Sequence, residues 1–274
     1  MAERRIIPDP NAGLVERAGL TLTVLGSGTS VGVPTLLCTC DVCRSTDPRN
    51  QRLRPSVALR WGHHCVVIDT GPDFRQQALR AGLARIDAVF FTHGHADHIM
   101  GLDDVRPFSY VQRGAIPVYG SEETLAIIRR VYSYAFHSEP TQSSRPKLDT
   151  RPFDGNPIKV ADLEFTVIPV MHGRGQCHGF RCGSLAYLTD HSEVPETSMQ
   201  MLEGLDVLFL DALRHDPHPT HSTIEQSLLL VERLRPKRVW FTHIAHDLDH
   251  ALTESRLPAG VRLAYDGLEV TVER

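Results

Sequence analysis

The stretch AVFFTHGHADH, residues 88–98, decides how the rest of the sequence is interpreted. Four apolar residues predict a short buried strand, and four potential metal ligands follow them within six residues. A loop that turns into a helix can direct His93 and His95 to one cation, while Asp97 and His98 reach a second one. Neutral imidazole and carboxylate are natural ligands of zinc and similar divalent ions. The stretch therefore predicts a two-metal centre, against the alternative that these groups cluster by chance on a solvated loop.

Short apolar segments that end in Gly, Asp or His recur along the chain, and each is typical of a buried strand bounded by a turn. They lie at 21–28, 64–71, 88–95, 164–173, 184–190, 206–212 and 238–246. Helical patterns lie between them, at 73–83, 121–136 and 223–236. This mixture predicts a layered α/β fold. The segment 137–157 is rich in Pro and polar residues, and it is interpreted as a surface excursion or lid.

Polar residues follow the last apolar residue of several predicted strands. They are Asp69, His93, His172, Asp190, Asp211 and His243. Because the strand ends of a packed sheet meet at one edge, the side chains can share one site. The sequence contains no internal repeat and no linker long enough to separate two domains. We expect an N-terminal extension, residues 1–20, followed by a single hydrolase domain, residues 21–274.

The composition limits the classes to which the protein can belong. The chain has 274 residues, with 29 basic against 33 acidic residues and a formal net charge of −4. This balance supplies no basic field that would draw the protein to nucleic acid or to an anionic membrane. The N-terminus has no apolar run of signal-peptide length, and no later stretch approaches the ~18–20 apolar residues of a membrane span. We therefore expect a cytoplasmic protein without a nucleic-acid partner or membrane contact.

The motif HxHxDH at 93–98 resembles the signature of the metallo-β-lactamase superfamily, without substitution. This resemblance implies an αββα four-layer sandwich that carries one or two metals at the sheet edges. It extends to three later residues, each placed after a predicted strand, that match metal ligands of the family. These are His172, Asp190 and His243.

The resemblance implies a division of these side chains between two divalent ions, zinc or manganese. One ion would be held by His93, His95 and His172, and the other by Asp97, His98 and His243, with Asp190 as the bridge. Asp69, in VVIDTG, matches the first motif of the family and is expected to orient the histidine loop without binding metal itself. Two cations that share a water lower its pKa enough to supply hydroxide near neutral pH, which suits hydrolysis.

The opening LGSGTSVGVPTLLCTCDVCRSTDPRNQRLRPS and the ending FTHIAHDLDH resemble the PhnP group of phosphodiesterases, from about residue 21 to the C-terminus. Members of that group open phosphoribosyl 1,2-cyclic phosphate, so the expected substrate is a small, cyclic phosphodiester. The resemblance also implies that Cys38, Cys40, Cys43 and His246 hold a structural zinc. Three thiolates and an imidazole would leave no open position for water. Free thiols or a disulfide are the alternative, and a homodimer is expected by resemblance alone.

His221 matches a histidine of the PhnP group that is not a metal ligand. We expect it to protonate the leaving alkoxide or to stabilise the phosphoryl oxygens. With Asp97 and Asp190 it forms the expected catalytic set. The neighbouring His215 and His218 are interpreted as solvated loop residues.

Four further residues are candidates for substrate contacts. Ser27 and Thr29 belong to a Gly-rich turn whose backbone N–H groups could face a phosphate, although a tight turn needs Gly in any case. Arg106 and Arg174 lie close in sequence to ligands and could neutralise a phosphate, although solvated Arg is the common alternative.

Three other functions share the metal motif. An RNA-processing endonuclease of the tRNA 3′ processing type would need a basic arm that this sequence lacks. A thioester or lactone hydrolase would use the same pair of metals on a carbonyl group. A noncatalytic metal-binding scaffold would be expected to lose ligands, whereas all seven are present.

Overall fold

The computed structural model describes residues 17–137 and 144–274, whose strands form two mixed seven-stranded sheets. The first sheet has the order β14-β1-β2-β3-β4-β5-β6 and the second has the order β13-β12-β11-β10-β9-β8-β7. The strands of the first are β1 (Arg17–Gly26), β2 (Ser56–Gly62), β3 (His64–Ile68), β4 (Ala88–Phe90), β5 (Ile116–Gly120), β6 (Leu148–Pro152) and β14 (Glu269–Val272). Those of the second are β7 (Ile158–Val160), β8 (Leu163–His172), β9 (Gly175–Cys182), β10 (Leu185–Leu188), β11 (Val207–Asp211), β12 (Arg238–Thr242) and β13 (Val261–Leu263).

Each sheet is antiparallel in one half and parallel in the other. In the first sheet β3, β4, β5 and β6 run parallel, and in the second β10, β11, β12 and β13 run parallel. Parallel strands point their carboxyl ends to one edge of a sheet. The residues that follow the strands of these two halves are therefore gathered at two edges, one in each sheet.

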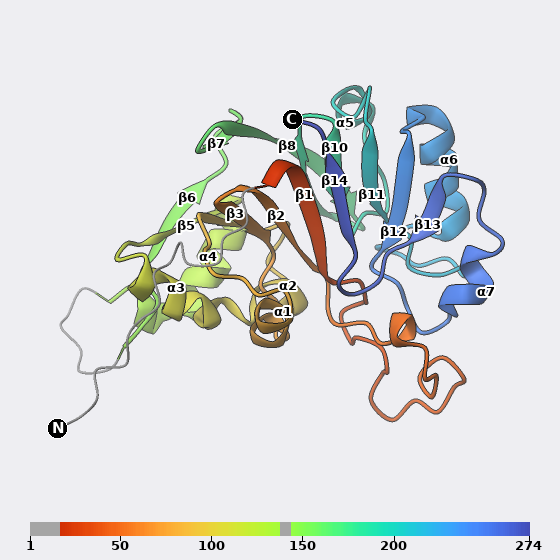
Figure 1. The fold of residues 1–274 in the computed structure, drawn as a ribbon, viewed down its shortest axis with the longest axis horizontal. Coiled ribbons are helices and arrows are strands. Elements are labelled where there is room, and N and C mark those ends of the chain that lie inside the picture. Colours follow the sequence, from red (N-terminus) through yellow and green to blue (C-terminus); the bar gives the residue numbers. More distant parts are fainter. Residues whose placement is uncertain (1–16, 138–143) are drawn as a thin grey trace.

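Helices cover the outer faces of both sheets, as Figure 1 shows for α1 to α4 on one side and α6 and α7 on the other. The α-helices are α1 (Phe74–Arg80), α2 (Ala96–Ile99), α3 (Arg106–Val111), α4 (Glu122–Val131), α5 (Glu196–Gln200), α6 (Ile224–Leu234) and α7 (His250–Glu254). The 3-10 helices are η1 (Pro48–Asn50), η2 (Leu102–Val105) and η3 (Ser133–Ala135). Ser121 caps α4 by accepting from the Thr124 N–H, and Thr223 forms a capping box with Gln226 at the start of α6.

The alternation of side chains along single strands defines the layers. In β3, Val66 and Ile68 pack into the cluster between the two sheets, whereas Cys65 and Val67 pack against the helices outside. Strands β10 and β11 alternate in the same way between the inner cluster and the second helical layer. Because both faces of these strands are buried, they are apolar without interruption. The predicted αββα sandwich is confirmed.

Two boundaries differ from the sequence-based expectations. Strand β1 begins at Arg17, inside the predicted N-terminal extension, while residues 1–16 lie outside the described residues. The predicted excursion at 137–157 contains β6, which pairs in parallel with β5 at the end of the first sheet. Residues 138–143 of that segment lie outside the described residues. Within the described part of the chain, no helix combines the length and the apolar character needed to cross a membrane.

Arg52 joins the long segment after β1 to the segment after β12. The side chain is 1% exposed, and its guanidinium donates to the Ala245 and Leu248 carbonyl oxygens, both at 2.7 Å. A third bond, of 2.9 Å, reaches the Asn50 side-chain oxygen. Burial lowers the pKa of Arg52 to about 10, which still leaves it charged near neutral pH. The charge is therefore satisfied mainly by carbonyl dipoles, and the two segments are held together by it.

We expect the Arg52→Met substitution to lower the free energy of unfolding by about 2–4 kcal/mol, because the buried Ala245 and Leu248 carbonyl oxygens each lose a charged donor. Urea denaturation of the metal-loaded protein measures this change. The matched control is Arg233→Met, which removes an exposed ion pair with Glu196 and should cost less than about 1 kcal/mol. Equal effects of the two substitutions would contradict a structural role for Arg52.

Candidate active site

The ends of strands from both sheets meet at one place. Asp69 follows β3, His93 lies shortly after β4, and His172 ends β8. Asp190, Asp211 and His243 lie at or just after the ends of β10, β11 and β12. Side chains from this set recur in neighbouring groups that could hold a metal ion. The expected convergence of strand ends is therefore present in the structure.

The first group is formed by His93, His95 and His172, whose ligand atoms lie within 4.8 Å of one another. His93 Nε2 is 2.8 Å from His95 Nδ1. His172 Nδ1 lies 2.9 Å from the Thr220 carbonyl oxygen, and because a carbonyl can only accept, this nitrogen carries the proton. The Nε2 lone pair of His172 is therefore left for a ligand. Burial lowers the pKa of His93 and of His172, which keeps both rings neutral as metal binding requires.

The second group is formed by Asp97, His98, Asp190 and His243, all of them buried. Asp190 Oδ2 lies 3.4 Å from His98 Nε2 and 3.4 Å from His243 Nε2. The same oxygen is 4.0 Å from His93 Nε2 in the first group. Asp190 therefore lies between the two groups, where a bridging carboxylate would be placed.

The donor atoms of the second group fit a cation. His98 Nε2 and both ring nitrogens of His243 are buried without a hydrogen-bond partner among the described residues. Unpaired buried polar atoms are costly, and each one needs an explanation. Although burial opposes it, the neighbouring imidazoles lower the pKa of Asp97 and of Asp190, so both carboxyl groups are ionised. Two carboxylates and two imidazoles whose ligand atoms lie within 4.8 Å of one another are a donor set that suits a divalent cation.

Asp69 fixes the ligand loop, residues 93–98, through hydrogen bonds with Thr92 and His98. Its carboxylate accepts from His98 Nδ1 at 2.7 Å and from the Thr92 N–H and hydroxyl, both at 2.9 Å. Asp69 is fully buried, and burial raises its pKa while its hydrogen bonds with His98 and Thr92 oppose the rise. A metal-binding histidine is commonly oriented by such a carboxylate on its other ring nitrogen.

Backbone geometry also directs these side chains. Asp69, Asp190 and His243 have φ values of 63°, 54° and 57°, in the left-handed region that non-glycine residues rarely adopt. Asp and His tolerate this region better than β-branched residues do, and strain of this kind concentrates at functional sites. Gly71 allows the ligand loop to approach Asp69, since a Cβ at Gly71 would lie 2.0 Å from the Asp97 carbonyl oxygen.

His221 is held beside both groups by a carboxylate to which the sequence assigned no function. Asp211 Oδ2 lies 2.8 Å from His221 Nδ1 and also accepts from the His191 N–H at 3.1 Å. The other nitrogen of His221, Nε2, is 4.0 Å from Asp190 Oδ2. Although burial opposes it, the hydrogen bond to Asp211 raises the pKa of His221. The sequence signal for Asp211 was its position after the apolar run VLFL, the same position that Asp69 has after β3.

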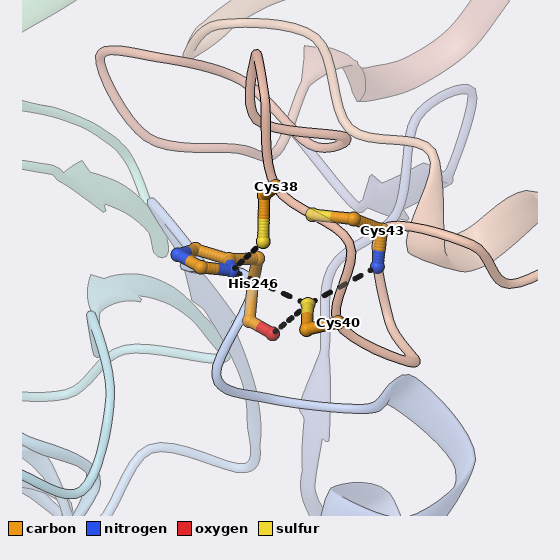
Figure 2. A group of neighbouring side chains, drawn as sticks. All are labelled: Cys38, Cys40, Cys43 and His246. Carbon is orange, nitrogen blue, oxygen red and sulfur yellow. Dashed lines mark hydrogen bonds between the residues drawn. The ribbon is translucent and has the colours of Figure 1, made fainter.

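A separate group joins Cys38, Cys40, Cys43 and His246, from the segment after β1 and the segment after β12. Figure 2 shows the His246 ring beside the cysteines, with its Nδ1 facing the Cys38 and Cys40 sulfurs, each 3.4 Å away. The hydrogen bond from His246 lowers the pKa of Cys40 to about 6, whereas burial raises the pKa of Cys43 to about 11. The described cysteines form no disulfide. The four side chains could therefore hold a metal ion, as expected.

The four predicted substrate-contact residues do not gather in one place as the ligand candidates do. Both donors of Ser27, N–H and hydroxyl, are used by Asp266 Oδ1 at 2.9 and 2.8 Å, so Ser27 supports the fold and has no donor left for phosphate. Arg106 donates to the Ser144 carbonyl oxygen and pairs with Asp103 at 3.4 Å. Neither Arg106 nor Thr29 lines the pocket beside His93 and His95. Arg174 is exposed in the turn between β8 and β9, next to that pocket.

The pocket has a volume of about 350 Å³ and opens over the first ligand group. Its walls come from the ligand loop, the first two turns of α4 and the start of β9. The lining residues are His93, Gly94, His95, Ser121, Glu123, Thr124, Ile127, His172, Gly175, Gln176 and Thr220. The residues from α4 and β9 carry no sequence motif, so the sequence alone did not identify them.

The two histidines that precede His221 differ in exposure. His215 is exposed and pairs with Glu225 at 2.7 Å, in line with its interpretation as a solvated residue. His218 is half-buried, and its ring centroid is 5.1 Å from that of His221.

Comparisons with known proteins agree with this geometry. Residues 64–244 match the family model described as the Beta-lactamase superfamily domain. A solved structure described as a new diphosphatase from the PhnP family is 50% identical, with a TM-score of 0.87, and covers 93% of this chain and 98% of its own. The zinc-bound PqqB structure from Methylobacterium extorquens is 20% identical with a TM-score of 0.72, over 92% of this chain and 100% of that one, which shows the fold alone.

Among curated proteins, an octanoyltransferase from Porphyromonas gingivalis (strain ATCC BAA-308 / W83) is 36% identical over 256 residues. The match covers 91% of this chain but 51% of that protein. A coenzyme PQQ synthesis protein B from Rhodopseudomonas palustris (strain TIE-1) is 33% identical over 172 residues, which is 55% of this chain and 52% of that protein. The chain thus spans about half the length of these curated relatives.

The ligand motif, the two stacked sheets and the convergence of strand ends all point to one family. The family model covers the segment that contains every residue of both ligand groups. The chain therefore belongs to the metallo-β-lactamase superfamily.

Proposed function

We propose that this protein is a metal-dependent hydrolase that cleaves a P–O bond in a small phosphodiester. The observation that carries the proposal is the position of His221, held by Asp211 and directed at the point where the two ligand groups meet. A histidine in that place can transfer a proton to a reacting group, a function that a noncatalytic metal-binding scaffold would not need. The 50% identity to a PhnP-family diphosphatase supports chemistry at phosphorus.

Both ligand groups would be filled by divalent ions, zinc or manganese. Two such ions would supply a hydroxide nucleophile near neutral pH and positive charge for the phosphoryl oxygens. The side chains that hold them are His93, His95 and His172 on one side and Asp97, His98 and His243 on the other, with Asp190 between. The chain has an acidic net charge, so its surface as a whole does not attract a phosphate. The positive charge of the two metal ions would do so instead.

His221 is proposed to donate a proton from Nε2 to the leaving oxygen. Asp211 accepts from Nδ1, which fixes the ring and favours its protonated form. The remainder of the substrate is proposed to occupy the pocket of about 350 Å³, between α4 and β9. A pocket of this size suits a small molecule. The expected homodimer remains a prediction.

A second candidate is a diphosphate bond. The 50% identical structure is described as a diphosphatase, and phosphoanhydride cleavage needs the same nucleophile and charge stabilisation. A thioester substrate is also tested, because a 36% identical relative is named an octanoyltransferase. This chain matches about half of that protein, 51% of its length.

We expect metal-dependent turnover of a phosphodiester or diphosphate by the purified, Mn²⁺- or Zn²⁺-loaded protein. His95→Ala should reduce it by more than the ~10–100-fold typical of losing a group outside the metal ligands, because a ligand itself is lost. The assay uses cyclic phosphates, linear diesters, a diphosphate diester, precursor tRNA, an octanoyl thioester and a lactone. The matched control is His63→Ala, an exposed residue between β2 and β3, which should leave turnover unchanged.

Each alternative predicts a different result in the same panel. Turnover of precursor tRNA alone would support the endonuclease, and turnover of the thioester or lactone alone would support acyl chemistry. Metal binding without turnover of any substrate would support the scaffold. Any of these three results would overturn the proposed function.

His221→Asn should lower kcat by about 10²–10⁴-fold for a diester with an alkoxide leaving group, which needs a proton to depart. With a p-nitrophenolate leaving group, which departs without protonation, kcat should change little. Asp211→Asn should show the same dependence on the leaving group to a smaller extent. Steady-state kinetics with the two leaving groups measure the difference.

Metal content must be determined for the same variants. His221 also lies near Asp190 and His172 in an arrangement that could bind metal. Loss of an active-site metal from His221→Asn, with equal effects on both leaving groups, would show that His221 is a ligand and not the acid.

We further propose that Cys38, Cys40, Cys43 and His246 hold a structural zinc. Cys40→Ser should lower the zinc content by one ion per chain while the active-site metals remain. Because the ion would join segments from the two ends of the chain, we expect the Tm to fall by roughly 5 °C or more, as ~2–4 °C corresponds to 1 kcal/mol in a chain of this size. Elemental analysis and thermal unfolding test this. Cys182→Ser is the matched control, a buried cysteine outside the group, and it should keep the full zinc content.

A further inference from the structure

Thr92 directly precedes the first metal-ligand candidate, His93, and is completely buried. Its backbone is fixed on both sides, because its N–H donates to Asp69 Oδ1 at 2.9 Å and its carbonyl accepts from the His178 N–H at 3.0 Å. The side chain is therefore held in one place between Asp69 and two histidines, one from each ligand group.

The hydroxyl of Thr92 has three possible partners. Its Oγ1 lies 2.9 Å from Asp69 Oδ2, 3.0 Å from His93 Nδ1 and 3.3 Å from His98 Nδ1. A hydroxyl has one proton to donate and two lone pairs that accept. The directions of these hydrogen bonds decide which nitrogen of His93 is available to a metal.

The directions follow from the strength of the acceptors. His98 Nδ1 is nearer to Asp69 Oδ2, at 2.7 Å, so its proton is donated to that carboxylate. The carboxylate is also the strongest acceptor within reach of the Thr92 hydroxyl, which donates its single proton there. The hydroxyl can then only accept from His93, so Nδ1 of His93 carries the proton and Nε2 carries the lone pair.

We propose that Thr92 is a positioning residue that transmits the orienting effect of Asp69 to His93. Asp69 then supports one histidine of each ligand group: His98 directly and His93 through the Thr92 hydroxyl. A single carboxylate behind the loop thereby sets the ring orientation and the tautomer on both sides of the metal centre. The inference rests on the two-metal site of the proposed function.

Cys177 is the other group near His93 Nδ1, with its sulfur at 3.7 Å. The Cys177 thiol donates to the Thr189 carbonyl oxygen, 3.6 Å from the sulfur, and a thiol sulfur is a weak acceptor. Without the Thr92 hydroxyl, the Nδ1 proton of His93 would face only this sulfur. His93 could then adopt the other tautomer, in which Nε2 carries the proton and cannot bind metal.

The substitution that tests this is Thr92→Val, which keeps the shape of the side chain and removes the hydroxyl. We expect it to weaken metal binding by about 10–100-fold in an Asp97→Ala background, where the first ligand group stays intact. In a His95→Ala background, where the second group stays intact, the change should be less than about threefold. Affinities are measured on the full chain by competition with a chelator, and Co²⁺ separates the cysteine site by its thiolate absorption.

Two variants control for simple damage to the fold. Thr92→Ser keeps the hydroxyl and should restore the affinity of the first group to within about threefold. Cys177→Ala removes the other neighbour of His93 Nδ1 and should leave that affinity nearly unchanged. If the double variants fail to fold, titration of Thr92→Val alone should show one of the two active-site binding steps weakened and the other retained.

Three results would overturn the proposal: equal weakening of both groups by Thr92→Val, no weakening of either, or failure of Thr92→Ser to restore binding. The proposed function fails by different observations. If the unaltered protein binds two metals but cleaves no phosphate substrate, the function is wrong while the assignment of Thr92 stands. If it binds no metal outside the cysteine group, the two-metal site is itself wrong.

Discussion

The packing of the two sheets against each other is the constraint on which the site depends. An uninterrupted apolar layer, with Phe90, Phe165 and Phe209 among its members, lies between them and fixes their relative position. Because the parallel half of each sheet directs its carboxyl ends to an edge, this packing brings Asp69 and His93 from one sheet to Asp190 and His243 from the other. Ionisable groups are costly to bury there, and they are tolerable where a carboxylate or an imidazole lies beside them or where a cation would bind.

Two carboxylates have matching functions in the two halves of the molecule. Asp69 follows β3 in the first sheet and accepts from His98, while Asp211 ends β11 in the second and accepts from His221. Each also accepts from a backbone N–H of its own sheet edge, that of Thr92 or that of His191. One carboxylate thus orients a candidate metal ligand and the other orients the proposed acid, so the proposed metal site and the proposed proton donor have separate supports.

The segment between β1 and β2 is fixed by means other than a sheet. Arg52 ties it to the carbonyl groups beside His246, and Asp266 accepts from Ser27 and from the Leu53 N–H. The three cysteines shown in Figure 2 lie on the same segment, whereas His246 lies on the segment after β12, three residues after His243. A zinc ion there would therefore stabilise the position of an active-site ligand without taking part in the reaction.

The sequence by itself predicted seven of the strands and a layered α/β fold, because apolar runs are local patterns, and the spacing HxHxDH predicted a two-metal centre. The αββα sandwich and the later ligand candidates His172, Asp190 and His243 came from the resemblance to a family. Strands with mixed polarity, such as β2 and β9, were not predicted, because their burial depends on packing against segments that are distant in the sequence. The phosphate contact expected of Ser27 was wrong, because Asp266, 239 residues away, takes both of its donors. Only the tertiary structure decided the partners of Thr92, Asp211 and the pocket residues of α4 and β9, because hydrogen bonds and cavities depend on distances between segments far apart in the chain.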